Sequence, residues 1–148
     1  MLTFFTLLSG SGIAQTDGSI RVKHYNLKDR VAIDGYDPVS YFDHSPREGS
    51  DEVTVTFKGI TYYFFSEANA SKFRSNPEKY EPAYGGWCAY AMGATGEKVK
   101  VDPETYKIID GTLYLFYNFW GNSTLDDWNK NPSELKASAD RNWKRATE

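Results

Sequence analysis

The chain contains a single cysteine, and one of its two methionines follows four residues later. Cys88 lies in the stretch YGGWCAYAM, which covers residues 84–92. If residues 87–92 are helical, this spacing places both sulfur atoms on one face of the helix. A thiolate and a thioether are soft ligands and suit Cu(I). Cys88 and Met92 are therefore the candidate metal ligands, with copper as the favoured metal, and the alternative is that both side chains fill the core.

Other residues with reactive side chains do not form a known catalytic pattern. The sequence has no G-x-S-x-G motif, no phosphate-binding loop, no dinucleotide fingerprint and no paired-cysteine zinc motif. A cysteine nucleophile would need His24 or His44, the only histidines, and neither lies in a supporting pattern. Asp34 and Asp37 flank a glycine turn, where they could bind a hard cation or, as we favour, form hydrogen bonds with the turn backbone. We therefore expect a binding protein rather than an enzyme.

Length and composition indicate one globular domain. The chain has 148 residues, of which 40% are hydrophobic and 25% charged, and this is enough to bury a sizeable core. Aromatic residues make up 16%, which favours β-rich structure around an aromatic core. The net charge is −3, whereas a general nucleic-acid binder is normally basic, so no nucleic-acid partner is expected.

The first residues have the pattern of a secretory signal. Residues 1–14 read MLTFFTLLSGSGIA, a short apolar run followed by small residues. We interpret them as a signal peptide cleaved after Ala14, so that the mature, exported chain begins at Gln15. The run is too short to span a bilayer, and no stable membrane insertion is expected. The alternative is an apolar N-terminal strand or helix that packs on the domain.

Two β-hairpins are the clearest secondary-structure elements. Residues 53–57 and 60–64 alternate in character and flank a Lys-Gly turn, and residues 106–109 and 112–117 flank an Asp-Gly turn. The expected cross-strand pairs are Phe57 with Ile60, Val55 with Tyr62, Val53 with Phe64, Ile108 with Leu113, and Tyr106 with Leu115.

Helices are expected around these hairpins, because caps and prolines mark their starts. The expected starts are Ser66, Asn76, Trp87, Ser123 or Thr124, and Asn131, with Gly93 ending the helix from Trp87 and a core stripe of Leu135, Ala139 and Trp143 in the last helix. Residues 20–25 alternate like a strand, and residues 102–104 repeat the cap-and-proline pattern of a helix start. The result is one compact α+β domain with two antiparallel β-hairpins packed against short helices and a C-terminal helix.

Six motifs follow one another along the chain: GYDPVSYF (35–42), FKGITYYFFSEANASKF (57–73), NPEKY (76–80), YGGWCAYA (84–91), DGTLYLFYN (110–118) and ADRNW (139–143). Together they resemble the YHS-domain family, and most of all its small exported bacterial members. The resemblance spans residues 31–143. It implies a YHS-like domain over residues 31–148, preceded by a leader and first strand over residues 15–30, and a periplasmic or secreted location.

The resemblance also implies a link with heavy-metal binding. Metal-binding members carry cysteines at the positions that match Ser40, Phe65 and Asn69, and this chain has none of the three. That thiolate site is therefore not expected here. The exported members typically carry a cysteine at the position of Cys88, so the resemblance favours Cys88 as the primary ligand.

We therefore expect a non-enzymatic exported protein that binds copper, another soft metal or a metal-containing cofactor through Cys88, with Met92 as helper. The first alternative is a metal-free interaction or scaffold module, in which Phe116, Phe119 and Trp120 form a contact patch for a protein partner. The second is a pocket for a small organic or tetrapyrrole ligand, lined by aromatic side chains and with Cys88 as an axial ligand.

Overall fold

Both predicted hairpins are present, and each forms the centre of a small sheet. The first joins β3 (Ser50–Phe57) to β4 (Ile60–Phe64), and β2 (Val31–Ala32) and β1 (Leu27–Lys28) extend it into a four-stranded sheet of order β1-β2-β4-β3. The second joins β5 (Asp102–Ile109) to β6 (Thr112–Phe116), and a further small hairpin joins β7 (Asn118–Phe119) to β8 (Asn122–Ser123).

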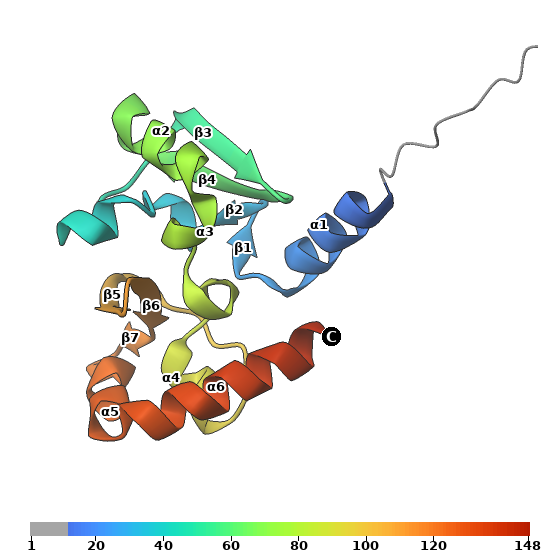
Figure 1. Cartoon of the computed structure of the whole chain (residues 1–148). Coiled ribbons are helices and arrows are strands. Elements are labelled where there is room, and N and C mark those ends of the chain that lie inside the picture. The colour runs from blue at the N-terminus through green and yellow to red at the C-terminus, as the bar shows by residue number, and fades with distance from the viewer. Residues whose placement is uncertain (1–11) are drawn as a thin grey trace, which may run out of the picture.

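Six α-helices surround these strands in the computed structural model, which describes the backbone of residues 12–148 and the side chains of residues 18–148. They are α1 (Gly12–His24), α2 (Glu67–Ser75), α3 (Pro77–Tyr80), α4 (Ala89–Ala94), α5 (Thr124–Lys130) and α6 (Pro132–Thr147). The described residues form one mixed α+β domain with a C-terminal helix, as the sequence predicts (Figure 1). Residues 1–11 of the predicted signal peptide lie outside the described residues.

The register of the hairpins confirms four of the five predicted pairs. These are Phe57 with Ile60, Val55 with Tyr62, Ile108 with Leu113, and Tyr106 with Leu115. The fifth pair is wrong, because an irregularity between Ser50 and Thr54 makes Phe64 pair with Ser50 instead of Val53. The apolar face of β4 is covered by α2, whose Phe73 ring lies 4.8 Å from the Tyr62 ring and 5.2 Å from the Phe64 ring.

Strand β6 links two hydrophobic clusters, because successive side chains of a strand point to opposite faces. Leu113 and Leu115 belong to the first cluster, which also contains the Phe73 ring and the β4 face. Tyr114 and Phe116 belong to the second cluster, which lies under α4, α5 and α6. In Figure 1 the first sheet with α2 and α3 is at the top, and β5 and β6 with α4, α5 and α6 are below. A strand buried on both faces therefore joins the two parts into one domain.

The predicted strand over residues 20–25 is wrong, since these residues belong to α1 and the turn after it. Arg21 and Tyr25 are one helical turn apart, and the Arg21 guanidinium donates to the Tyr25 hydroxyl at 2.7 Å. The same guanidinium pairs with Glu81, sixty residues further on. The contact between Arg21 and Glu81 thus stabilises a helix at residues whose alternation of apolar and polar side chains favours a strand.

Two other local predictions are wrong. Residues 102–104 begin β5 instead of a helix, because Asp102 accepts hydrogen bonds from the Glu104 N–H and the Thr105 hydroxyl and so forms a turn at the start of a strand. Gly93 lies within α4, which ends at Ala94. A Cβ at Gly93 would lie 2.5 Å from the Leu135 carbonyl oxygen, so this glycine allows α4 to pack closely on α6.

Candidate functional site

Cys88 lies at the N-cap of α4 and is fully buried. The Tyr117 N–H donates a hydrogen bond to Sγ at 3.4 Å, and Thr124 Oγ1 lies 3.3 Å from Sγ. Because the Thr124 hydroxyl donates its own hydrogen to the Tyr117 carbonyl at 2.8 Å, the contact with Cys88 suits a thiol S–H that donates to Thr124. The sulfur therefore has protein partners on both its acceptor and donor sides.

Met92 is also fully buried, but its side chain belongs to a different cluster from that of Cys88. The Met92 N–H donates to the Cys88 carbonyl at 3.0 Å, so the backbone spacing is the helical one that the sequence predicts. The Cys88 side chain packs into the first cluster, and the Met92 side chain packs into the second. The structure thus retains the predicted spacing without placing the two side chains in one cluster.

The histidines lie in different surroundings. The ring of His24 lies 3.0 Å from the Lys98 ammonium, and burial together with the charges of Lys98 and Lys23 lowers the pKa of His24 below its usual value. His44 is exposed and follows the short helical turn Ser40–Asp43. Within residues 18–148, no three His, Cys, Asp or Glu side chains gather in a way that could hold a metal ion. In the part of the chain that the structure describes, no helix is long and apolar enough to cross a membrane.

Asp37 is a fully buried carboxylate whose oxygens both accept hydrogen bonds. Oδ1 accepts from the N–H groups of Val39 and Ser40 at 2.8 and 3.2 Å, which is the backbone role that we favoured for this turn. Oδ2 accepts from the Phe65 N–H at 2.9 Å and from the Asn69 side chain at 2.8 Å. The sequence predicts the first pair of bonds but not the second, which ties the turn to the end of β4 and to α2.

The positions that the YHS resemblance matches to cysteines lie around this carboxylate. Ser40, Phe65 and Asn69 line a hollow of about 260 Å³, together with Asp43, Ser45, Arg47 and Ser66. Phe65 is 55% exposed, and the Arg47 guanidinium lies 4.6 Å from the centre of its ring. A hydroxyl, a phenyl ring and an amide replace three thiolates, so these residues do not fit a soft metal ion.

Trp120 projects from the turn between β7 and β8 and is 95% exposed. Its φ is +59° and that of Gly121 is +75°, so both central residues of the turn are left-handed. The neighbouring aromatic side chains do not project in the same way. Phe116 is fully buried, and Phe119 is partly buried, with the Tyr117 ring 5.0 Å from its own and the Lys100 ammonium 4.7 Å from its centre. Of the predicted contact patch, only Trp120 is a fully projecting side chain.

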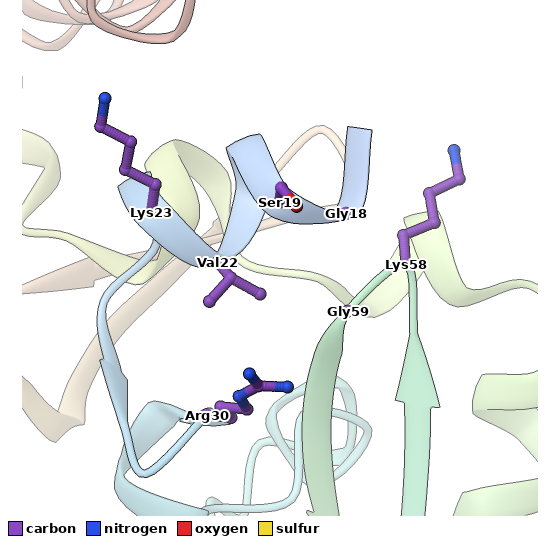
Figure 2. Close-up of a pocket in the computed structure, with 7 residues that line it drawn as sticks. All are labelled: Gly18, Ser19, Val22, Lys23, Arg30, Lys58 and Gly59. Atoms are coloured by element: carbon purple, nitrogen blue, oxygen red, sulfur yellow. The ribbon is translucent and has the colours of Figure 1, made fainter. Parts of the chain in front are cut away.

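A hollow of about 620 Å³ lies between α1 and the turns of the first sheet (Figure 2). Its lining residues are Gly18, Ser19, Val22, Lys23, Arg30, Lys58 and Gly59. Sequence reasoning missed this hollow, because it depends on α1 being a helix that crosses the Lys58-Gly59 turn. A Cβ at Gly59 would lie 3.2 Å from a Val22 methyl group, which shows how closely α1 packs on the turn.

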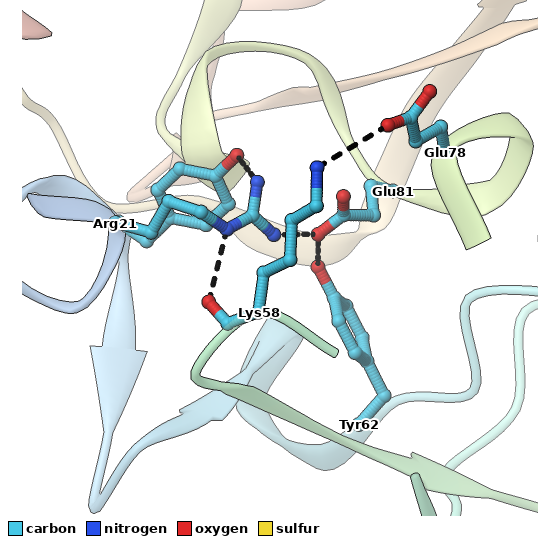
Figure 3. Close-up of polar contacts among 6 residues, drawn as sticks. Arg21, Lys58, Tyr62, Glu78 and Glu81 are labelled. Atoms are coloured by element: carbon cyan, nitrogen blue, oxygen red, sulfur yellow. Dashed lines mark hydrogen bonds and ion pairs between the residues drawn. The ribbon is translucent and has the colours of Figure 1, made fainter. Parts of the chain in front are cut away.

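A polar network beside this hollow fixes α1 to the first sheet (Figure 3). The Arg21 guanidinium pairs with Glu81 at 2.5 Å and donates to the Lys58 carbonyl at 3.1 Å. The Tyr62 hydroxyl donates to the same Glu81 oxygen at 2.6 Å. Burial, and secondarily the Glu81 charge, raise the pKa of Tyr62 well above its ordinary value. Since each of these groups already has a partner, the network serves to hold α1 in place.

No model of a protein family, no curated protein and no solved structure matches this chain. The resemblance to the YHS-domain family stays a prediction from the six motifs.

Proposed function

We propose that this chain is a non-enzymatic, exported interaction module that binds a protein partner through Trp120. The observation that carries the proposal is the 95% exposure of this indole at the tip of a two-residue turn. Export rests on the signal-like pattern of residues 1–14. The YHS resemblance is compatible with such a module, because the cysteines of the metal-binding members are missing.

The position of Trp120 strains the backbone and leaves its side chain without any stabilisation by burial, which for a large apolar side chain is about 1.5–3 kcal/mol. A left-handed backbone at a residue with a bulky side chain costs roughly 1–2 kcal/mol. Asn or Gly would fit such a turn with less strain. Exposed tryptophans contribute strongly to binding where they enter a pocket of a partner, and this accounts for the residue at this position.

The turn that carries Trp120 is held in place by its surroundings. The Asn118 side chain donates to the Thr105 hydroxyl at 3.0 Å, and the Thr124 N–H donates to the Tyr117 carbonyl at 2.9 Å. A side chain presented on a pre-organised support loses less conformational entropy on binding. The expected partner surface is therefore an apolar pocket of indole size, with a hydrogen-bond acceptor for the Trp120 Nε1–H.

A photo-crosslinking experiment tests the proposal. A benzophenone amino acid replaces the exposed Asn122, which leaves the Trp120 indole in place, in one variant and the exposed Lys72 of α2 in a matched control. We expect a discrete crosslinked product at position 122 and none at position 72. Excess wild-type protein should compete for the product, and excess Trp120→Asn should not. Equal competition by wild type and Trp120→Asn would refute a role for the indole.

A soft-metal function is the second candidate. It is supported by the helical spacing of Cys88 and Met92, whose backbones share the 3.0 Å hydrogen bond. Since Cys88 Sγ is fully buried, copper binding would require the contacts with Tyr117 and Thr124 to open. A Cu(I) titration of wild type, Cys88→Ser and Met92→Leu tests it. Loss of one equivalent in Cys88→Ser would support the metal site, and equal uptake by wild type and Cys88→Ser would exclude Cys88 as its ligand.

A further inference from the structure

All the charged side chains that line the hollow between α1 and the first sheet are basic. Its charged residues are Lys23, Arg30 and Lys58, although the whole chain has a net charge of −3. Figure 2 shows Val22 and Arg30 facing each other across the gap beneath α1, whereas the side chains of Lys23 and Lys58 extend away from this gap. The hollow thus has a solvent-accessible guanidinium at one wall, an apolar side chain opposite it, and two lysines whose ammonium groups lie further out.

These cations are only weakly neutralised by the protein. Among the described residues, Lys23 and Arg30 take part in none of the ion pairs. Lys58 lies 3.6 Å from Glu78, but both side chains are largely exposed, and such pairs contribute about 0–1 kcal/mol. The more buried carboxylate nearby, Glu81, accepts from Arg21 and Tyr62 instead. A positive field therefore remains over the hollow.

The backbone at Arg30 lies in the left-handed region. Asp29 and Arg30 form the turn between β1 and β2, with φ of +52° and +69°. The second position of such a turn strongly favours glycine, and a long side chain there is strained. Arg30 thus occupies a position where its backbone is unfavourable, and its side chain points into the hollow.

We propose that this hollow binds a phosphate group, with Arg30 as the ligand and with Lys58 and Lys23 adding positive charge at its outer edge. A guanidinium presents a planar fork of N–H donors that matches two phosphate oxygens at once. The lysine ammonium groups further out add a positive field that favours an anion over a neutral ligand. The open space beside Val22 leaves room for the organic part of the molecule, which can be a small phosphate ester or the headgroup of a phospholipid.

Amide NMR titrations of the full chain test this proposal. The probes are inorganic phosphate, glycerol 3-phosphate, and phosphatidylcholine vesicles with or without phosphatidylglycerol. We expect saturable shifts at Arg30 and Gly59 on addition of a phosphate probe. Arg30→Gln should weaken binding by about tenfold or more, because it removes a charge-assisted bidentate contact. Arg30→Lys, which retains the charge without the fork, should bind with intermediate affinity, and Arg141→Gln on α6 is the matched control.

The two probe sets separate the two sources of phosphate. Saturable binding of glycerol 3-phosphate that Arg30→Gln weakens assigns a soluble ester, and binding only to phosphatidylglycerol vesicles with the same sensitivity assigns a lipid headgroup. Absence of saturable change with every probe overturns the proposal. So does an affinity that is equal in wild type, Arg30→Gln and Arg30→Lys, with folding of each variant verified by thermal unfolding.

Discussion

Cys88 and Met92 share a backbone hydrogen bond of 3.0 Å, yet their side chains pack into two different hydrophobic clusters. Cys88 is the N-cap of α4 and not its first helical residue. Strand β6 contributes residues to both clusters, with Leu115 in the cluster of Cys88 and Phe116 in the cluster of Met92. A spacing of four residues is thus compatible with two separate packing roles as well as with one shared ligand site.

The burial of Cys88 predicts a protected thiol. Its Sγ is fully buried and hydrogen-bonded, so a water-soluble disulfide reagent should modify the native protein much more slowly than the unfolded protein. The measurement is the rate at which the Cys88 thiol releases the chromophore of the reagent, with and without urea. The same measurement after addition of Cu(I) shows whether a bound metal slows the reaction of the thiol. Rapid modification of the folded protein would contradict the buried position.

The strain at Trp120 predicts that a less costly residue stabilises the protein. Trp120→Asn should raise the free energy of unfolding by roughly 0.5–1 kcal/mol, because Asn-Gly suits a turn with two left-handed residues. Urea unfolding measures this change. Trp120→Phe retains an aromatic side chain in the same backbone conformation and should stay close to wild type. A large loss of stability in Trp120→Asn would show that the indole supports the fold and is not held for a partner.

The hairpins could be predicted from sequence because their signals are local. The Lys-Gly and Asp-Gly turns and the alternation around them determine the pairs of Phe57 with Ile60 and Ile108 with Leu113. The irregularity near Ser50 could not be predicted in this way. A Cβ at Gly49 would lie 2.4 Å from the Tyr63 carbonyl carbon, so the path of this strand depends on a backbone contact between residues far apart in sequence.

The candidate sites could be predicted to a smaller extent, because many of their contacts join residues that are far apart in the sequence. The bonds of Asp37 to Val39 and Ser40 follow from a short turn pattern, whereas its bonds to Phe65 and Asn69 need the folded sheet. The sequence shows an aromatic segment at residues 116–120, but it does not predict which of the rings projects into solvent. That choice depends on β6, where Phe116 faces inward, and on the separate turn that exposes the indole two residues after β7 begins.

Buried tyrosines predict a loss of stability at alkaline pH. Burial raises the pKa of Tyr62, Tyr41 and Tyr84 well above the ordinary value, whereas the same groups in the unfolded chain ionise near pH 10. Above that pH the unfolded chain binds fewer protons than the folded one, so the free energy of unfolding falls. Their contribution is fully present below pH 10 and is lost as the pH rises further toward the folded values.

Urea unfolding at successive pH values from about 8 to 11 measures this loss. Tyr84→Phe removes one titrating group together with its 2.8 Å bond to Asp140, and should give a lower stability at pH 8 and a shallower fall above pH 10. An unchanged slope in Tyr84→Phe would contradict the assignment of this tyrosine to the alkaline transition.

The close contact of α4 with α6 predicts a penalty at Gly93. Gly93→Ala would place a Cβ 2.5 Å from the Leu135 carbonyl oxygen, and relieving such a clash costs about 1–3 kcal/mol. Gly18→Ala in α1 is the control, since it is also a helical glycine and the nearest atom to its Cβ lies at 3.7 Å. We expect no loss there, because alanine favours a helix over glycine. Chemical unfolding compares the two, and a Gly93→Ala protein as stable as wild type would contradict the packing.

The burial of the Asp37 carboxylate predicts a loss of stability when an amide replaces it. Its two oxygens accept hydrogen bonds from Val39, Ser40, Phe65 and Asn69. Asp37→Asn replaces one oxygen by an NH₂ group, which then faces N–H donors and leaves them unpaired. We expect a loss of about 3 kcal/mol in the free energy of unfolding.

Asp34→Asn is the matched control, because Asp34 is exposed in the same turn region, and its replacement should change stability by less than about 0.5 kcal/mol. Urea unfolding of both variants at neutral pH gives the comparison. A loss confined to Asp37→Asn would show that this carboxylate joins the turn at residues 37–40 to the end of β4 and to α2. Similar small changes in both variants would mean that the Asp37 hydrogen bonds contribute little to the free energy of unfolding.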